Sequence, residues 1–346
     1  MGEKAMMFRF NKSFFSHMAL VLIFTMLAGC GAAGGAAEGT ANTSQAAGAS
    51  VNAGSAANGG TDSSAGEETR IIKHAMGETE IKGTPQKVVT LFQGANDVVV
   101  ALGVKPAGVV ESWAQQPVYE YLRADLEGVP IVGQETQPNL EEIHKLKPDL
   151  IIANKTRHED IYEQLSQIAP TVMLETLYDW KETLKTAGAA LNLEDKSDQL
   201  LSDWEARVAD FKEKMGDRLP IEATITNFRA DQVRIYYMGY AGQILQELGF
   251  TRPPGHDEDI WGVELASKEA IPDMNADMIF NFNYSADGEA VQKNYEEWTK
   301  SKLWANLDAV KNNQFVQVDE VIWNLGGGYK SANLLLDGLY EYFKLN

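Results

Sequence analysis

Cysteine is almost absent from this 346-residue chain, which contains only Cys30. No disulfide can form within it, and no set of thiolates can bind a metal ion. Positive charge is also scarce, because 30 lysines and arginines face 49 acidic residues, which gives a formal net charge of −19. This balance argues against nucleic acid or an anionic lipid surface as the partner. The chain must be stabilised by a hydrophobic core, which its 44% of hydrophobic residues allow.

Motifs of catalytic sites are missing as well. The sequence has no G-x-S-x-G, no H-E-x-x-H and no cysteine nucleophile in its main part. The stretch GGGYKS, residues 326–331, resembles a phosphate-binding loop, but Tyr329 separates the last glycine from Lys330 and breaks the required spacing. We therefore expect no enzymatic activity.

The first thirty residues have the features of an export signal. Lys4, Arg9 and Lys12 give a positive start, and the apolar run FFSHMALVLIFTM follows. This run is too short to span a membrane, so a signal peptide, residues 1–29, is favoured over a transmembrane helix. It ends in LAGC, which resembles the bacterial lipoprotein box, and this resemblance makes Cys30 the residue that would carry the lipid.

The next segment, residues 30–67, consists almost entirely of Gly, Ala, Ser, Asn and Thr. It has few side chains to bury, so we predict a disordered tether with the reach of a random coil. Such a tether next to a lipidated cysteine would hold a soluble domain away from a membrane surface.

From Thr69 to the C-terminus, short apolar strands alternate with helical segments. The hairpin-like TRIIKHAMGETEIKG comes first, and strand signals such as KVVTLF and PDLIIA follow. The alternation restarts near Ile221 with IEATITNF and VRIYYM. This pattern predicts two Rossmann-like α/β lobes with parallel sheets, residues 68–190 and 218–346.

Residues 191–217 join the two lobes and predict a single long helix. Apolar residues recur three or four positions apart along it, at Leu201, Trp204, Val208, Phe211 and Met215. About 23 helical residues would extend roughly 35 Å at 1.5 Å per residue, enough to run along both lobes. Since a helix resists bending more than a loop does, we expect the lobes to close only modestly on a ligand.

One short segment occurs twice. NLEEIHKLKPDLIIANK begins at Asn139, and SKEAIPDMNADMIFNFN begins at Ser267, 128 positions later, so that the two align without a gap. Each begins with a good N-cap residue and carries a glutamate, Glu141 or Glu269, at the second helical position. A glutamate there stabilises a helix by roughly 0.3–1 kcal/mol through the helix dipole. Two equivalent copies could also present paired negative side chains on one face of the protein.

Two further segments are HAMGETEIKGTPQKVVTL, before the first copy, and RIYYMGYAGQILQELGFTRP, before the second. Four such segments in this order after a lipoprotein box resemble the ferric-siderophore-binding lipoproteins of ABC importers. The resemblance runs from about Thr69 to the end of the chain. It implies a monomer with a ligand cleft between the lobes, and a preformed Fe(III)–siderophore complex as ligand with no cofactor. It also implies that Glu141 and Glu269 contact arginines of two permease subunits, whose cytoplasmic ATPase drives uptake. The protein would then stand at the extracytoplasmic face of the bacterial cell membrane.

Ligands of open α/β sheets bind beyond the carboxyl ends of the strands. The loops at these ends are rich in aromatic and cationic side chains, which form flat walls and donate hydrogen bonds to ligand oxygens without contacting the iron. Arg229 and Trp323 match positions that often contact the ligand in the hydroxamate-type relatives. We expect the ligand to contact Gln93, Trp113, Arg157, Arg229, Tyr240, Trp261, Tyr284 and Trp323.

The acidic composition favours a neutral or weakly charged ferric hydroxamate over a strongly anionic catecholate complex. The same kind of lipoprotein could instead bind haem, cobalamin, zinc or manganese. A zinc or manganese site would need several histidines and carboxylates in the cleft, and no i, i+4 pair exists among His74, His144, His158 and His256. We therefore predict no metal site made by the protein, and retain a lipid-anchored hydrolase only as a remote alternative.

Overall fold

The structure is a computed structural model and describes residues 69–258, 260–283 and 288–345. The predictions for the signal peptide, for Cys30, for the tether and for Tyr284 lie outside the described residues. Among the helices that are described, none is long and apolar enough to cross a membrane.

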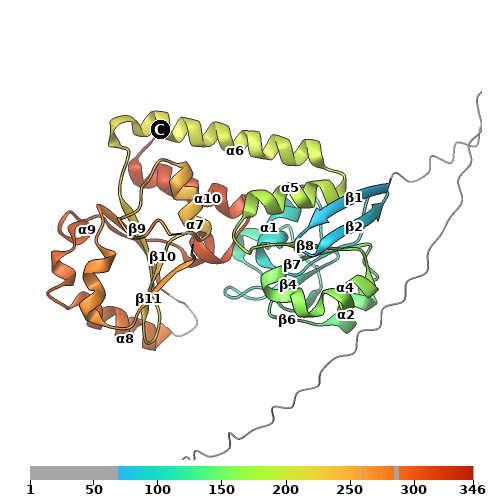
Figure 1. Ribbon diagram of the computed structural model, residues 1–346, viewed down its shortest axis with the longest axis horizontal. Coiled ribbons are helices and arrows are strands. Elements are labelled where there is room, and N and C mark those ends of the chain that lie inside the picture. Colours follow the sequence, from blue (N-terminus) through green and yellow to red (C-terminus); the bar gives the residue numbers. More distant parts are fainter. Residues whose placement is uncertain (1–68, 259, 284–287, 346) are drawn as a thin grey trace, which may run out of the picture. The chain divides into compact units, whose positions relative to one another are not determined.

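The first lobe is built on a six-stranded sheet with the strand order β6-β5-β4-β3-β7-β8 (Figure 1). All neighbouring strands are parallel except β5 and β6, and the hairpin predicted before the sheet is formed by β1 and β2. In chain order, the elements are β1 (Thr69–His74), β2 (Gly77–Lys82), β3 (Val88–Thr90), α1 (Gln93–Ala101), β4 (Gly108–Glu111), η1 (Glu120–Leu122), β5 (Ile131–Gln134), β6 (Gln137–Pro138), α2 (Leu140–Leu146), β7 (Leu150–Asn154), α3 (Lys155–His158), η2 (Glu159–Ile161), α4 (Tyr162–Ile168), β8 (Thr171–Leu174) and α5 (Trp180–Leu191).

The long helix predicted between the lobes is α6, Glu194–Met215, which runs along both of them (Figure 1). Its fully buried Trp204 contacts each lobe. The ring lies edge-on to Trp180 of the first lobe, with 5.2 Å between ring centroids. The indole Nε1 donates a hydrogen bond of 2.8 Å to Oε2 of Glu247 in the second lobe. The prediction of two lobes joined by one helix is confirmed.

The second lobe contains a five-stranded sheet in the order β11-β10-β9-β12-β13. Strands β9, β12 and β13 are parallel, but β10 pairs antiparallel with β9 and β11, so the prediction of a fully parallel sheet is wrong for this part. The reason is that only four residues separate β9 from β10, too few for the crossover that parallel neighbours need. In chain order, the elements are η3 (Gly216–Arg218), β9 (Ala223–Phe228), β10 (Val233–Tyr236), α7 (Tyr240–Glu247), β11 (Gly262–Leu265), η4 (Lys268–Met274), β12 (Met278–Asn283), α8 (Gly288–Thr299), η6 (Trp304–Asn306), α9 (Asp308–Lys311), β13 (Phe315–Gln317), the π-helix η7 (Val321–Leu325) and α10 (Tyr329–Phe343).

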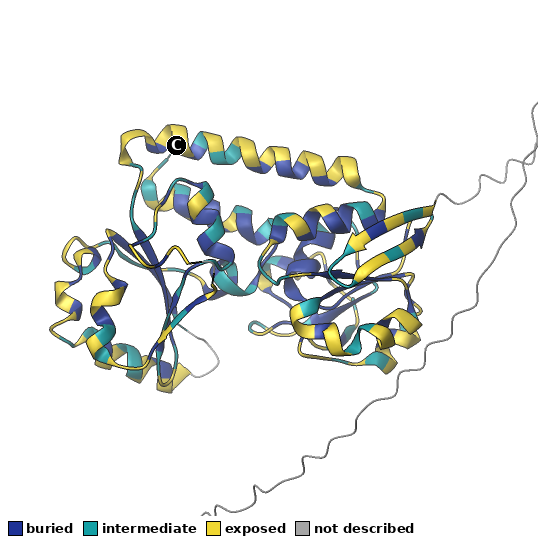
Figure 2. Cartoon of the chain, viewed as in Figure 1, coloured by how far each residue is buried: buried dark blue, intermediate teal, exposed yellow. Residues whose placement is uncertain are grey.

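Burial follows the layers of both lobes. Figure 2 shows buried strands at the centre and helices that are buried on the side facing the sheets and exposed on the other. This is the pattern that amphipathic helices on a buried parallel sheet produce. The largest apolar cluster includes residues of both sheets together with α6 and α10, so the core is continuous between the lobes.

The duplicated segment has the same start in both lobes. Oδ1 of Asn139 accepts hydrogen bonds from the backbone N–H groups of Glu141 (3.1 Å) and Glu142 (3.2 Å). Oγ of Ser267 accepts one from the N–H of Glu269 (3.4 Å). Both predicted N-caps are therefore confirmed, and both glutamates are exposed in the first helical turn.

An aspartate near the end of each copy binds the backbone directly before a neighbouring strand. Asp149 accepts hydrogen bonds of 2.8 Å from the backbone N–H groups of Gln86 and Lys87, directly before β3. Asp277 accepts one of 3.1 Å from the N–H of Glu222, directly before β9. The equivalence of the two copies thus extends from the sequence to the hydrogen bonds.

A buried carboxylate connects α1 of the first lobe to α10. Asp97 is fully buried and accepts hydrogen bonds from the backbone N–H groups of Lys330 (2.7 Å) and Ser331 (2.9 Å), in the first turn of α10. The hydroxyl of Tyr121 donates a third bond of 2.9 Å. Burial raises the pKa of this carboxyl, while the donors at the helix N-terminus favour its charged form.

We predict that Asp97→Asn lowers the free energy of unfolding by about 1–3 kcal/mol, because an amide leaves one buried backbone donor of α10 without an acceptor. Urea unfolding of wild type and variant measures this loss. Asp149→Asn is the matched control, since Asp149 also accepts from two backbone N–H groups but is exposed, and its loss should be smaller. Equal losses, or a gain of stability in Asp97→Asn, would contradict the role of Asp97.

Candidate functional site

A cleft with a volume of about 340 Å³ lies between the lobes. The first lobe contributes the start of α1, the loops after β4, β5 and β8, and helix α3 after β7. The second lobe contributes residues around β10 and α7 and the end of η7. In the first lobe this is the edge at which the parallel strands end, where open α/β sheets bind their ligands. The lining residues are Phe92, Gln93, Gly94, Trp113, Glu135, Arg157, Leu177, Tyr178, Arg229, Arg234, Tyr236, Gly239, Tyr240, Trp261, Asn324, Leu325 and Gly327.

Most of the predicted ligand contacts lie in this one cleft. The two tryptophans, Trp113 and Trp261, belong to opposite lobes and are 43% and 44% exposed, so each offers a large aromatic surface. A contact of these residues with a ligand stays a prediction. The predicted residues that line the cleft are Gln93, Trp113, Arg157, Arg229, Tyr240 and Trp261.

Trp323 is not brought to the cleft with the others. Its side chain is only 6% exposed, packs on Phe280 with 4.6 Å between ring centroids, and lines a separate groove beside α10. It lies in the π-helix at residues 321–325, of which Asn324 and Leu325 line the cleft instead. No pattern in the sequence indicates a π-helix, a rare element that occurs mostly at functional sites.

Two of the predicted residues use their polar atoms to build the cleft wall. Nε2 of Gln93 donates a hydrogen bond of 2.9 Å to the carbonyl oxygen of Glu111. The hydroxyl of Tyr240 donates one of 2.7 Å to the carbonyl oxygen of Gly328, and both side chains are only 4% exposed. The side chains of Gln93 and Tyr240 are therefore part of the cleft wall and do not project into the cleft.

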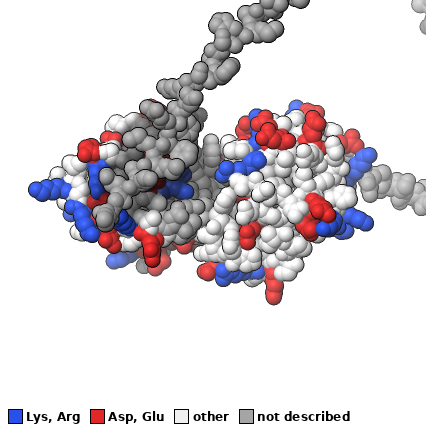
Figure 3. All heavy atoms as spheres, turned by 90° about the horizontal axis from the view of Figure 1, so that it is seen from below, with Lys and Arg blue, Asp and Glu red and all other residues white. Residues whose placement is uncertain are grey.

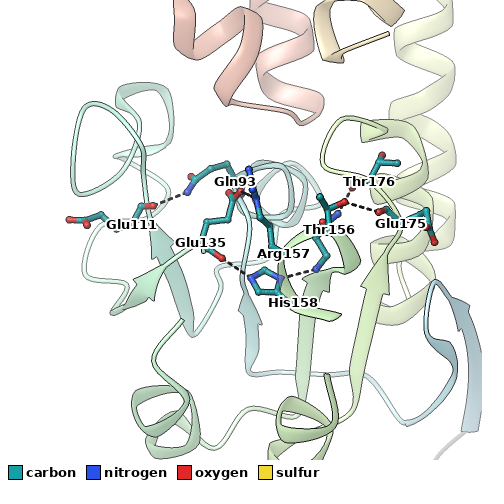
Figure 4. Close-up of polar contacts among 9 residues, drawn as sticks. Gln93, Glu111, Glu135, Thr156, Arg157, His158, Glu175 and Thr176 are labelled. Carbon is teal, nitrogen blue, oxygen red and sulfur yellow. Dashed lines mark hydrogen bonds and ion pairs between the residues drawn. The ribbon is translucent and has the colours of Figure 1, made fainter. Parts of the chain in front are cut away.

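Glu135 is a cleft residue that the sequence analysis missed. This carboxylate is 4% exposed, and its Oε2 accepts a hydrogen bond of 3.1 Å from the backbone N–H of Gln93. Its Oε1 lies 3.4 Å from Nε of Arg157, on α3 (Figure 4). Burial raises the pKa of Glu135, whereas the Gln93 N–H and the Arg157 guanidinium act in the opposite direction.

A buried histidine fixes the loop that carries Glu135. Nδ1 of His158 accepts a hydrogen bond of 3.1 Å from the backbone N–H of Asn154, so this nitrogen carries no proton. Nε2 of the neutral ring must then be the protonated nitrogen, and it donates 2.7 Å to the carbonyl oxygen of Glu135 (Figure 4). Burial lowers the pKa of His158, in agreement with a neutral ring.

The second lobe contributes two arginines. Nη1 of Arg229 donates to Oδ1 of Asn227 at 3.3 Å, at the end of β9. Arg234 donates from Nη2 to Oε1 of Glu264 at 2.8 Å, and its guanidinium lies 5.4 Å from the ring centroid of Trp261. A cation over an indole face is stabilised by the ring quadrupole, so Arg234 and Trp261 orient each other.

Within the described part of the chain, no group of three or more His, Cys, Asp or Glu side chains could hold a metal ion. His144 is exposed on α2, and both ring nitrogens of His158 make hydrogen bonds. The described cleft thus offers arginine, amide and aromatic groups, which suit the oxygens and the organic frame of a ligand.

Comparison with known proteins identifies the family. A sequence profile of the family "Periplasmic binding protein" matches residues 88–321. The chain belongs to the periplasmic binding proteins. Members of this family are solute-binding proteins, not enzymes, and the resemblance to ferric-siderophore-binding lipoproteins is confirmed.

Three periplasmic binding proteins are similar over most of their length. The crystal structure of Staphylococcus aureus SirA complexed with staphyloferrin B is 52% identical, with a TM-score of 0.78, and the match covers 80% of this chain and 99% of that one. The probable siderophore-binding lipoprotein YfiY of Bacillus subtilis is 44% identical, over 80% of this chain and 88% of the relative. The achromobactin-binding periplasmic protein of Dickeya dadantii is 44% identical, over 74% of this chain and 85% of the relative.

We predict that His158 makes the folded protein less stable in acid. Its folded pKa lies below the ordinary value of 6.5, so below pH 6.5 the unfolded chain binds a proton that the folded chain excludes. The free energy of unfolding should therefore fall as the pH drops from 6.5 toward the folded pKa. In His158→Gln, urea unfolding at a series of pH values should show a shallower fall, with exposed His144→Gln as control. Identical slopes in wild type and His158→Gln would mean that the folded and unfolded chains protonate this ring equally, which would contradict the prediction.

Proposed function

We propose that this protein is an extracytoplasmic receptor that binds a ferric siderophore in the cleft and delivers it to an ABC permease. The observation that carries the proposal is the lining of the cleft, which combines the exposed rings of Trp113 and Trp261 with three arginines from both lobes. Such a lining suits a chelate whose iron is already saturated, because it offers flat walls and donors to ligand oxygens. The similarity to SirA, solved with staphyloferrin B, supports the same function.

The charge of the cleft favours an anionic chelate. The prediction of a ferric hydroxamate rested on the net charge of the whole chain, yet acidic and basic side chains are interspersed over the described face in Figure 3. In the cleft, Arg157, Arg229 and Arg234 outnumber the one carboxylate, Glu135. Arginine binds carboxylates through paired hydrogen bonds, so we propose a ferric chelate with anionic oxygens, and the hydroxamate stays the alternative.

The proposal includes the way the receptor is held near its permease. A lipid on Cys30 and the tether of residues 30–67 would keep the monomeric receptor at the extracytoplasmic face of the cell membrane. Two relatives carry the words lipoprotein and periplasmic in their names, which supports this location. The ligand would arrive as a preformed Fe(III) complex, without a further cofactor.

Glu141 and Glu269 are proposed to contact the permease. Both are exposed, and the side chain of Glu141 is 81% exposed. Glu141 lies 3.7 Å from Lys145, but an exposed ion pair of this kind contributes little to stability. An arginine of a permease subunit can therefore replace this contact at little cost.

We predict that an anionic ferric chelate such as ferric citrate quenches the tryptophan fluorescence of the protein saturably, because Trp113 and Trp261 line the cleft. Arg229→Ala should weaken binding about tenfold or more, through loss of a charge-assisted hydrogen bond. The controls are Arg218→Ala, which removes an arginine outside the cleft lining, and parallel titrations with a ferric hydroxamate, a catecholate, haem, cobalamin and zinc. A response to zinc alone would overturn the proposed function.

Removal of both exposed glutamates should separate binding from delivery. The Glu141→Ala, Glu269→Ala double variant should bind the ligand in solution like wild type but fail to support iron uptake by cells. The matched control is Glu205→Ala with Glu213→Ala, two exposed glutamates on α6. Normal uptake by the first double variant, or an equal loss of ligand affinity in it, would contradict the docking role.

A further inference from the structure

A buried carboxylate in a cleft that binds anions needs an explanation. Glu135 follows β5, is 4% exposed and lines the cleft. An ionised carboxylate is costly to bury unless charges or hydrogen-bond donors surround it. It would also repel an anionic ligand. The contacts of Glu135 therefore indicate its role in the cleft.

The contact between Glu135 and Arg157 uses one particular edge of the guanidinium. Oε1 of Glu135 lies 3.4 Å from Nε, the nitrogen nearest the chain. Among the described residues, Nη1 and Nη2 of Arg157 make no hydrogen bond, and the side chain is 37% exposed in the cleft. The guanidinium is a rigid planar fork, so a contact at Nε sets the direction of the two terminal nitrogens.

Glu135 itself is held from two sides. The first N–H of α1, from Gln93, donates to Oε2 at 3.1 Å, which fixes the carboxylate within the first lobe. The neutral ring of His158 bridges the carbonyl oxygen of Glu135 and the backbone N–H of Asn154. Since Arg157 precedes His158 on α3, this bridge holds the loop of Glu135 in register with the arginine (Figure 4).

We propose that Glu135 is a positioning residue for the ligand, which holds Arg157 by Nε so that Nη1 and Nη2 face an anionic group of the ferric chelate. The inference rests on the proposed function and adds to it a determinant of specificity. Glu135 does not touch the ligand. It acts through Arg157, whose two terminal nitrogens match the two oxygens of a carboxylate.

The test is a double-mutant cycle with ferric citrate, an anionic chelate, and ferrichrome, a neutral trihydroxamate, as titrants. We expect Glu135→Gln to weaken binding of ferric citrate about tenfold in the wild-type background, and to change nothing further in Arg157→Met. Binding of ferrichrome should change much less. The control is Glu175→Gln, which removes an exposed carboxylate that pairs with Lys155, also on α3.

A second variant separates position from charge. Glu135→Asp keeps the negative charge but withdraws it by one methylene, so the contact with Nε is lost and binding of ferric citrate should weaken as in Glu135→Gln. Urea unfolding of each variant shows whether it is folded at the temperature of the titration.

Several outcomes would overturn the inference while leaving the proposed function intact. These are tighter binding in Glu135→Gln, wild-type affinity in Glu135→Asp, or an equal loss in the Arg157→Met background. Absence of binding of every ferric chelate by the wild-type protein would overturn the proposed function, and the inference with it.

Discussion

The contact between Asp97 and the start of α10 fixes how the two walls of the cleft meet. Asp97 lies on α1, whose first turn contributes Gln93 and Gly94 to the cleft, and α10 follows directly on the loop that contributes Gly327. A Cβ at position 94 would lie 2.6 Å from the carbonyl oxygen of Gly327, so only glycine permits this approach. The glycine run resembles a phosphate-binding loop, but the group bound at the N-terminus of α10 is the protein's own carboxylate, Asp97.

This fixed frame matters because the cleft holds its charged groups ready before a ligand arrives. Arg157 is oriented by a buried carboxylate in the first lobe, and Arg234 by Glu264 and the face of Trp261 in the second. Donors that are already oriented lose less conformational entropy when they bind. A ligand with anionic oxygens on two sides can then be held from both lobes. The modest closure of the lobes expected from the single helix α6 stays a prediction.

Local rules predicted most of this architecture and part of the site. The spacing of apolar residues and the length of each segment predicted the strands and α6. The rule for strand ends predicted four residues of the cleft: Gln93, Trp113, Arg157 and Arg229. Trp323 was predicted as a ligand contact, but its ring is buried against Phe280 of β12, a residue far away in the sequence that no local pattern pairs with it. Glu135 escaped because its burial depends on Arg157 and His158, 22 and 23 residues away, and a glutamate in a turn is usually exposed.

The two copies of the duplicated segment form different kinds of helix, yet both present an exposed glutamate. The first copy is an α-helix, whereas the second is a 3₁₀-helix that contains Pro272, which lacks a backbone N–H. In both, a capped start and a fully buried isoleucine, Ile143 or Ile271, hold the glutamate outward. Few peptide dipoles are aligned in so short a 3₁₀-helix, so stabilisation of the helix explains the second glutamate poorly. A contact with permease subunits, as proposed, would account for both Glu141 and Glu269.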